Sequence, residues 1–284
     1  MKETVKFIKQ TRFGQWFKRT AVCDFLKKSQ GDWRYPFLIF SWGLAELMIP
    51  RKKVTVDHVS FTLPCNNWIT HFRWYLFKRK EEEVRYYIDH YVREGDNFFD
   101  IGANIGVFSI YTAKRFSNIA CYCFEPEYSN LHILKENIIA NQISHKATVY
   151  SLAVGNSIGL SYLNLHDLTL GAASHTESKE AIKTTQEGFP VVGSEGIVVM
   201  TLDYICQELG IVPNTLKIDT DGNEDKVLQG AVKTLQDKRL RSLVLEMPDG
   251  RAKQLHCCQM LAEAKFDLEW SDKDKTRNQI WVKK

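Results

Sequence analysis

A cluster of small residues follows an acid in the middle of the chain. Asp100 ends a short apolar segment and precedes the sequence Gly102-Ala103-Asn104-Ile105-Gly106, after which apolar residues recur at helical spacing. This layout predicts a buried strand, a tight turn and the first turn of a helix. Gly102 and Gly106 remove side chains where a ligand lies against the backbone, and a helix start offers unpaired N–H groups. Together with acids at the ends of other strands, this stretch would predict a nucleotide-type binding site.

Three other acids stand at the ends of apolar segments. Glu125 follows residues 121–124, and its carboxylate could accept hydrogen bonds from two ribose hydroxyls. Asp219 and Glu246 end two later apolar segments. In an open α/β sheet the binding crevice lies beyond the carboxyl ends of the strands, so Asp100 and these three acids should share one rim. Acids scattered over a surface would not select strand ends, which favours a functional site.

Strand and helix patterns alternate from residue 98 onward, which predicts parallel strands with helices on both faces. The last two predicted strands are joined by a short charged turn and should form an antiparallel hairpin at the sheet edge. The predicted fold is therefore α/β and Rossmann-like, with a seven-stranded, mostly parallel sheet. Its strands are 98–100, 121–125, 148–154, 215–218, 242–246, 266–270 and 279–282. Its helices are 81–91, 105–115, one through 131–138 with Pro126 in its first turn, a short one from Thr201, one through 227–235, and 252–264.

The chain is predicted to contain one large domain and an extension. Residues 81–284 form the α/β domain, and residues 1–80 form a basic and aromatic extension with short helices and strands. Within the extension, residues 54–63 suit a strand that residues 72–77 could join. A polar stretch, 155–196, interrupts the domain as an irregular insertion with one short strand at 160–165. Substrate specificity is expected in this insertion and in the extension.

Composition limits the class of protein. Hydrophobic residues make up 44% of the 284 residues, enough for a sizeable core, and the net charge of +4 implies no partner. The seven cysteines form no CxxC pair, which favours free thiols in a reducing compartment. We find no signal peptide, and the longest apolar run, 36–50, is too short to span a bilayer. These features predict a cytoplasmic protein.

Residues 1–53 carry a strong positive charge, with twelve Lys/Arg against four Asp/Glu. Basic residues beside aromatic ones suit an interfacial helix on anionic lipid, at the inner face of a membrane. The alternative, which we favour, is a helical extension that packs on the catalytic domain or on a second copy in a homo-oligomer.

The segment from Asp96 to Glu246 resembles the FkbM family of S-adenosylmethionine-dependent methyltransferases. The matching pieces are Asp100–Gly106, Phe124-Glu125-Pro126, Asn130 with Leu134 and Asn137, Ala153-Val154-Gly155, Thr201-Leu202-Asp203, Leu216-Lys217-Ile218-Asp219, Gly222-Asn223-Glu224, 227–231 and Leu245-Glu246. The resemblance implies a class I methyltransferase fold, S-adenosylmethionine as cofactor, and methylation of an oxygen, with sugar hydroxyls the commonest acceptors. Asn104 stands where the general class has glycine, Asp221 where the family usually has glutamate, and Asn223 where it usually has a small residue.

Physical chemistry and the resemblance give the same candidate residues. The cofactor-binding candidates are Asp100, Gly102, Ala103, Asn104, Gly106, Glu125, Pro126 and Ala153. Asp100 and the turn suit the amino-acid end of the cofactor, Glu125 suits the ribose, and the Ala153 region suits the adenine. A sugar hydroxyl is a poor nucleophile, so a general base should matter. Asp219 is the first candidate base, Glu246 the second and His175 the third; no metal site is predicted.

Other functions are weighed against this one. A nicotinamide-dependent oxidoreductase also uses a glycine turn, but this turn lacks the GxGxxG spacing. A nucleic-acid amino methyltransferase typically uses an Asn/Asp-Pro-Pro-aromatic motif, and the chain has no Pro-Pro pair. Methylation of another small molecule stays open. The intact turn argues against a catalytically silent binding module, and no specific nucleic-acid partner is predicted.

Overall fold

A computed structural model gives the fold of the chain. It describes residues 41, 44, 45, 48, 51–56, 58–77, 82–169, 171–173, 175–178, 191–271 and 277–284. Most of the basic region 1–53 and most of the predicted charged turn at 272–277 lie outside these residues. The chain divides into two compact units, Met1–Arg51 with Pro64–Asn66, and Lys52–Leu63 with Asn67–Lys284. Apart from Arg51 and Pro64, every residue of the elements below belongs to the second unit; the domain boundary predicted at residue 80 stays a prediction.

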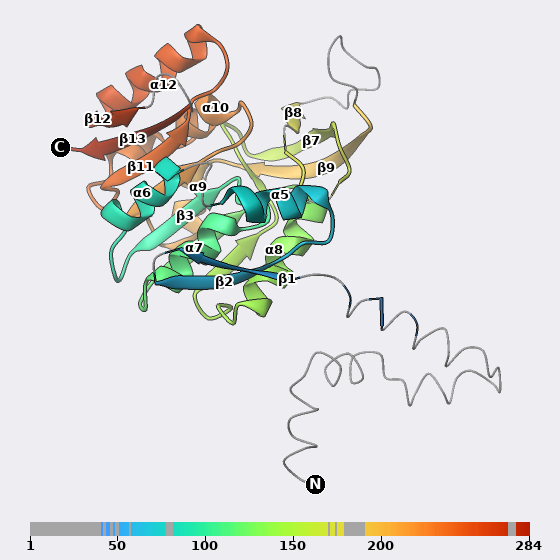
Figure 1. Cartoon of the computed structure of the whole chain (residues 1–284). Coiled ribbons are helices and arrows are strands. Elements are labelled where there is room, and N and C mark those ends of the chain that lie inside the picture. The colour runs from blue at the N-terminus through green and yellow to red at the C-terminus, as the bar shows by residue number, and fades with distance from the viewer. Residues whose placement is uncertain are drawn as a thin grey trace. The chain divides into compact units, whose positions relative to one another are not determined.

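A seven-stranded sheet forms the centre of this unit, in the order β12-β13-β11-β10-β3-β4-β5 (Figure 1). Its strands are β3 (Asn97–Ile101), β4 (Ala120–Phe124), β5 (Ala147–Tyr150), β10 (Thr215–Ile218), β11 (Ser242–Glu246), β12 (Phe266–Ser271) and β13 (Asn278–Lys283). β13 runs antiparallel to both of its neighbours, and the other pairs are parallel. The predicted fold class is confirmed, with the Asp100 strand inside the sheet between β10 and β4.

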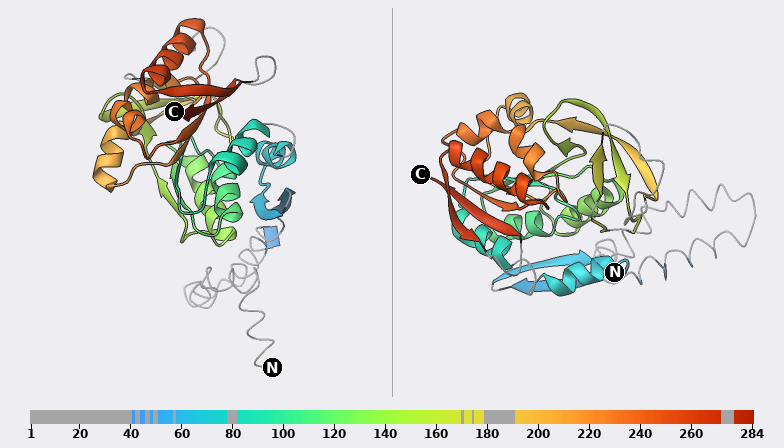
Figure 2. Two further views of the ribbon diagram at one scale, coloured as in Figure 1. Left: turned by 90° about the vertical axis from the view of Figure 1, so that its left-hand side faces the viewer. Right: turned by 90° about the horizontal axis from the view of Figure 1, so that it is seen from above.

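Helices cover both faces of this sheet (Figure 2). One layer holds α6 (Glu82–Tyr91), α7 (Val107–Arg115) and α8 (Tyr128–Ala140); the other holds α9 (Leu202–Leu209), α10 (Glu224–Gln229), α11 (Val232–Gln236) and α12 (Arg251–Glu263). Successive residues of β3 point to opposite faces, so Phe98 packs in the first layer and Phe99 in the second. The layers therefore form two apolar cores that fix the sheet between them.

A second sheet occupies the stretch that the sequence suggested was mostly irregular. Its order is β6-β9-β7-β8, with β6 (Ala153–Val154), β7 (Gly159–Leu165), β8 (Thr176–Ser178) and β9 (Gly193–Met200). The predicted strand 148–154 is therefore wrong in its second half, because Ala153 and Val154 leave β5 and pair with β9. Alternate residues of β7 and β9 build a small separate core from Leu163, Leu165, Ile197 and Val199.

The region before α6 also differs from the prediction. Residues 54–63 form two strands, β1 (Arg51–Val56) and β2 (Val59–Pro64), instead of one. Residues 72–77 do not form a strand, because α5 (Trp68–Leu76) covers most of them. The cause is a capping box: the Asn67 side chain accepts from the N–H of Thr70 at 2.8 Å, and the Thr70 hydroxyl accepts from the N–H of Asn67 at 3.2 Å.

The start of α8 corrects a smaller detail. Pro126 does not lie in the first turn of this helix, because Glu127 is the N-cap and its carboxylate accepts from the N–H groups of Ser129 and Asn130.

In the part of the chain that the structure describes, no helix is both long and apolar enough to cross a bilayer.

Candidate active site

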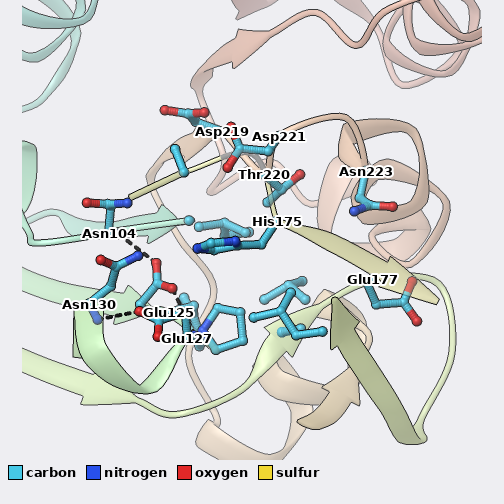
Figure 3. A pocket seen from close by; sticks show the side chains of 18 of the residues that line it. Asn104, Glu125, Glu127, Asn130, His175, Glu177, Asp219, Thr220, Asp221 and Asn223 are labelled. Carbon is cyan, nitrogen blue, oxygen red and sulfur yellow. Dashed lines mark hydrogen bonds between the residues drawn. The ribbon is translucent and has the colours of Figure 1, made fainter. Parts of the chain in front are cut away.

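A cavity of about 340 Å³ opens beyond the carboxyl ends of the central strands (Figure 3). Its volume is within the range of small-molecule sites. Two kinds of element line it. Residues at or just after the carboxyl ends of β3, β4, β10 and β11 form one wall, and residues of the second sheet and of the loop before β8 form the other. Of the candidates, Gly102, Asn104, Glu125, Pro126, Ala153, His175, Asp219 and Glu246 line the cavity; Asp100, Ala103 and Gly106 are not among its described lining residues.

The glycine turn is held against both neighbouring strands. The N–H groups of Gly102 and Ala103 both donate to the carbonyl of Phe124, each at 3.0 Å. Gly102 has φ +75°, and a Cβ there would lie 1.7 Å from the carbonyl oxygen of Asp219. A glycine is therefore required for the turn to approach Asp219 so closely.

Glycine is needed at position 106 for a different reason. Its φ is +81°, and a Cβ there would lie 2.2 Å from Cδ1 of Leu134 in α8. Gly106 therefore lets the start of α7 pack on α8, which sets the shape of the turn from behind the cavity wall.

Glu125 is fixed by the turn and by the start of α8. Its Oε2 accepts from the N–H of Asn104 at 2.7 Å, and its Oε1 accepts from the N–H of Glu127 at 3.0 Å. Burial raises the pKa of Glu125 to about 7, although both hydrogen bonds favour the charged form. Each carboxylate oxygen has a second lone pair, so the group can accept hydrogen bonds from a diol.

Apolar side chains also line the cavity. They include Ala153, Leu152, Val154, Leu163 and Val199. These residues come from β6, β7 and β9 and from the turn before β6. A slot of this kind can take the flat, weakly polar ring of a nucleobase.

Asp100 lies behind the turn and forms a buried ion pair. It is 1% exposed, accepts from the Ser109 hydroxyl at 2.6 Å, and has Oδ1 3.1 Å from Nζ of Lys217. Lys217 is 3% exposed and faces Asp100 across the parallel pair β10–β3. Its Nζ also lies 3.4 Å from Oδ2 of Asp219 and donates to the Gly102 carbonyl at 3.4 Å. One ammonium thus connects the two acids and the turn.

No role for Lys217 is predicted from the sequence. A signal was present: a lysine inside a four-residue apolar strand is almost never buried unless it is paired. The acid two positions later marks one partner, but the second partner, Asp100, comes from the register of β3 and cannot be seen locally.

Asp219 and Glu246 share the opposite side of the turn. Burial acts to raise the pKa of Asp219, but Lys217 and a hydrogen bond from Glu246 outweigh it and lower the pKa. Burial and the charge of Asp219 raise the pKa of Glu246 to about 8, against the opposing effect of Arg277, whose Nη2 donates to Oε1 of Glu246 at 2.9 Å. Near neutral pH the pair therefore holds one proton, on Glu246, and Asp219 is the anion.

His175 belongs to the second wall. It is buried, the N–H of His166 donates to its Nδ1 at 3.4 Å, and burial lowers its pKa, so the imidazole is neutral at pH 7. Figure 3 shows the ring between the acids that follow β4 and those that follow β10.

Two amide side chains hold the loop before His175. Asn104 and Asn130 both donate through Nδ2 to the carbonyl of Ala172, at 2.8 and 3.0 Å. Oδ1 of Asn130 accepts from the N–H of Gly171 at 2.9 Å. This role of Asn130 was not predicted, because its partner lies more than forty residues further along the chain.

The side chain of Glu224, in the first turn of α10, binds backbone N–H groups of the preceding loop. Its Oε1 accepts from the N–H groups of Thr220 and Gly222, at 2.8 and 3.0 Å. Over the described ranges, no group of three or more His, Cys, Asp or Glu side chains is placed to hold a metal ion.

Comparison with known proteins identifies the domain that contains this site. The methyltransferase FkbM domain matches residues 100–268. The chain is 29% identical over 187 residues to 31-O-demethyl-FK506 methyltransferase FkbM of Streptomyces tacrolimicus, covering 58% of this chain and 71% of that protein.

Two solved structures are similar in fold. Methyltransferase FkbM of Methylobacillus flagellatus KT is 15% identical with a TM-score of 0.45, and the match covers 75% of this chain but only about half, 52%, of that one. Precorrin-6y C5,15-methyltransferase of Geobacter metallireducens GS-15 is 11% identical with a TM-score of 0.43, covering 72% and 89% of the two chains.

Sheet order, strand-end acids and glycine turn together define a Rossmann-like methyltransferase. The domain match extends over more than half of the chain, from the first acid of the turn to β12. The chain belongs to the FkbM methyltransferase family. S-adenosylmethionine is its methyl donor, and methyl transfer replaces the oxidoreductase alternative.

The cavity fits this cofactor in its chemistry. Glu125 offers carboxylate oxygens for a ribose diol, and the slot at Ala153 is apolar. Gly102 and Asn104 line the same cavity as Glu125 and Asp219. The carboxylate of Asp100 is occupied by Lys217 and Ser109 on the far side of the turn.

Proposed function

We propose that the protein methylates a hydroxyl oxygen of its acceptor, and that the acceptor is a sugar of a glycan or glycolipid. One observation carries the proposal: an anionic carboxylate, Asp219, lines the same cavity as the glycine turn and Glu125. The name of the relative from Streptomyces tacrolimicus specifies an acceptor that lacks a methyl group on oxygen, which supports an oxygen acceptor here.

Residues on the cofactor side divide into two groups in this proposal. Glu125, Gly102, Asn104, Pro126 and Ala153 contact the cofactor, because they line the cavity. Asp100, Ala103 and Gly106 act from behind by fixing the turn. The bound cofactor supplies a methyl group on a positively charged sulfur.

Asp219 takes the proton of the acceptor hydroxyl. Its lowered pKa makes it a weak base toward a free alcohol. An alcohol oxygen that is gaining a methyl group becomes strongly acidic, however, so a weak, correctly placed carboxylate is sufficient late in the transfer. Holding the hydroxyl in line with the methyl group then supplies much of the acceleration.

Glu246 and His175 assist in different ways. Glu246 carries the proton of the carboxyl pair near neutral pH, so it can donate a hydrogen bond to the acceptor or to Asp219. His175 is neutral and is the alternative proton acceptor. Its Nδ1 accepts from the N–H of His166, so Nε2 carries the ring proton, and His175 can take the acceptor proton only when that hydrogen bond breaks.

The charges around the cavity favour a small acceptor over nucleic acid. Its lining includes six acids, Glu125, Glu127, Glu177, Asp219, Asp221 and Glu246, against three basic residues, Arg73, Lys226 and Arg277. Lys226 is paired with Glu177 at 2.8 Å and Arg277 with Glu246 at 2.9 Å. A nucleic-acid backbone is attracted by unpaired basic surface, which this cavity largely lacks.

The direct test is methyl transfer from S-adenosylmethionine with a labelled methyl group to a panel of purified sugars, followed by mass spectrometry and NMR. We expect label in an ether-linked O-methyl group. Label on nitrogen or carbon, or label in RNA but in no sugar, would replace this proposal by one of the alternatives.

Location and assembly stay predictions from the basic region 1–53. We propose a cytoplasmic protein whose extension packs on its own domain or on a second copy, with peripheral contact to anionic membrane as the alternative. Sedimentation with phosphatidylserine vesicles at low and high salt separates the two: salt-sensitive pelleting of the full chain supports the membrane, and none supports packing.

A further inference from the structure

A second cavity lies next to the first, along one side of α5. Its volume is about 260 Å³, and we call it the α5 groove. Its lining is mostly apolar and aromatic: Trp68, Ile69, Phe72, Phe77, Val107 and Phe108, with Arg73, Asp167 and residues 171–173. Arg73, Ala172 and Ala173 line both cavities, so the α5 groove adjoins the candidate active site.

Large aromatic rings are exposed at the α5 groove. Trp68 is 70% exposed and Phe72 is 47% exposed, one helical turn apart on the same helix. Beneath them, the ring of Phe77 packs against that of Phe108 with centroids 5.8 Å apart. Exposed rings over an apolar floor can hold the C–H face of a sugar ring or an apolar substituent.

Arg73 stands where the two cavities meet. Its Nε donates to the Gly171 carbonyl at 2.8 Å, which holds the guanidinium in place. Among the residues that the structure describes, neither Nη1 nor Nη2 of Arg73 makes a hydrogen bond or ion pair. Of the three basic residues around the first cavity, it is therefore the one whose charge is not neutralised by a direct partner.

Asp167, the acid of the α5 groove, does not pair with Arg73. Its Oδ1 accepts from the N–H of Thr169 at 2.8 Å. A fixed guanidinium with two donor nitrogens in a fork matches a carboxylate or a phosphate better than it matches a neutral group.

We propose that the α5 groove binds the acceptor: Trp68 and Phe72 hold an apolar ring or aglycone, and Arg73 binds a carboxylate or phosphate group beside the hydroxyl to be methylated. The proposal rests on the O-methyl transfer proposed above and adds a substrate class, an acidic or phosphorylated glycoside with an apolar portion. The acceptor then enters through the α5 groove and reaches Asp219 past Arg73.

Three probes test this class: phenyl β-D-glucuronide, phenyl β-D-glucoside 6-phosphate and the neutral phenyl β-D-glucoside. Each is titrated into the full-length protein saturated with S-adenosylhomocysteine, and dissociation constants are read from ligand-observed NMR. We expect at least one anionic probe to bind about ten-fold or more tightly than the neutral one. Preference for the glucuronide identifies a carboxylate as the natural group, and preference for the 6-phosphate identifies a phosphate.

Variants assign the binding to residues. Arg73→Gln should abolish the preference for the anionic probe and leave the neutral probe unchanged. Phe72→Ala should weaken all three probes about five-fold or more. Tyr75→Ala is the matched control, because it removes a ring that is 48% exposed on the same helix but outside the α5 groove, and it should change nothing.

Several outcomes would overturn the proposal. These are no binding of any probe, equal binding of charged and neutral probes, or equal losses in Phe72→Ala and Tyr75→Ala. If Arg73→Gln does not fold, added NaCl should weaken only the anionic probe in the unmodified protein, and a salt-independent affinity overturns the role of Arg73.

Calorimetry with S-adenosylhomocysteine keeps this result separate from the proposed function. Normal binding of S-adenosylhomocysteine by Arg73→Gln and Phe72→Ala shows that both variants keep the cofactor site, so a loss of probe binding in them is assigned to the α5 groove. If the unmodified protein binds S-adenosylhomocysteine but none of the probes, the α5 groove alone is rejected. Failure of the unmodified protein to methylate any oxygen rejects the proposed function instead.

Discussion

The two walls of the first cavity are held by different kinds of interaction. The wall with Gly102 and Glu125 is fixed by strand register and by backbone N–H groups at 2.7–3.0 Å. The wall with His175 is tied to it through side chains, chiefly the amides of Asn104 and Asn130 on one carbonyl. The difference fits our proposal, in which the first wall and the apolar residues around Ala153 hold the cofactor and the loop with His175 faces the acceptor.

The largest effect, a loss of turnover, is expected at Asp219, the proposed general base. Asp219→Asn removes the anionic oxygen but keeps the shape of the side chain. Turnover with the acceptor should fall by roughly 10²–10⁴-fold, the range that general bases contribute. The affinity for S-adenosylhomocysteine in calorimetry should barely change.

Asp225→Asn is the control for Asp219→Asn, because Asp225 lies in the first turn of α10 and is not among the described lining residues. Near-normal turnover of Asp219→Asn would remove it from the mechanism and favour His175 or Glu246 as the base.

The next largest effect is expected at the buried lysine of the first wall. Lys217→Met leaves Asp100 and Asp219 without their cation, and breaking a buried pair costs about 3–5 kcal/mol. Urea unfolding at pH 7 measures the loss of stability. Lys226→Met, which breaks the more exposed pair with Glu177, should cost about 1 kcal/mol or less. Equal losses in the two variants would show that Lys217 is not a special support of this wall.

A third prediction concerns the affinity of the first wall for S-adenosylhomocysteine. S-adenosylhomocysteine should bind with a micromolar dissociation constant, about −8 kcal/mol. Glu125→Ala should weaken it by roughly 10–100-fold, because hydrogen bonds to a charged group are worth about 1.5–3 kcal/mol. Asp100→Ala should weaken it as well, through the turn. Unchanged affinity in both variants would place the cofactor elsewhere.

A fourth prediction tests the second wall. Asn130→Ala removes both hydrogen bonds to residues 171–172 and should cost about 1–2 kcal/mol of stability. The KM for the acceptor should rise more than the dissociation constant of S-adenosylhomocysteine. If the cofactor is weakened as much as the acceptor, the two walls do not act separately.

The last effect is gradual, a slope of stability with pH. The pKa values of Glu125 and Glu246 rise on folding from 4.5 to about 7 and about 8, so the folded state binds these protons more tightly than the unfolded chain does. The free energy of unfolding should therefore fall as the pH rises from about 5 to 8, by at most about 1.4 kcal/mol per pH unit for each group. Thermal unfolding at several pH values measures this, and Glu125→Gln should flatten the slope up to pH 7. His175, whose pKa is lowered, gives a smaller slope of opposite sign below about pH 6.5. The same slope in the unmodified protein and in Glu125→Gln would contradict the raised pKa of Glu125.

Features set by local sequence patterns could be predicted, and features set by contacts between distant residues could not. The central strand, the acids at strand ends and the closing hairpin follow from local patterns of apolar residues, and the structure has all three. The pairing of β6 with β9 and the contact of Lys217 with Asp100 depend on residues far apart in the chain. Even α5 was missed, because its capping box stands before a stretch whose aromatic residues also suit a strand.

The bond from Asn130 to Ala172 has a consequence for the design of variants. The side-chain amides of Asn104 and Asn130 both donate to the main-chain oxygen of residue 172, and any residue at that position would present this oxygen. A combinatorial library at positions 173, 175 and 177 can therefore exchange the chemistry that faces the acceptor while the anchor of the loop is kept. Such a library would search for new acceptors without altering the donor half of the reaction.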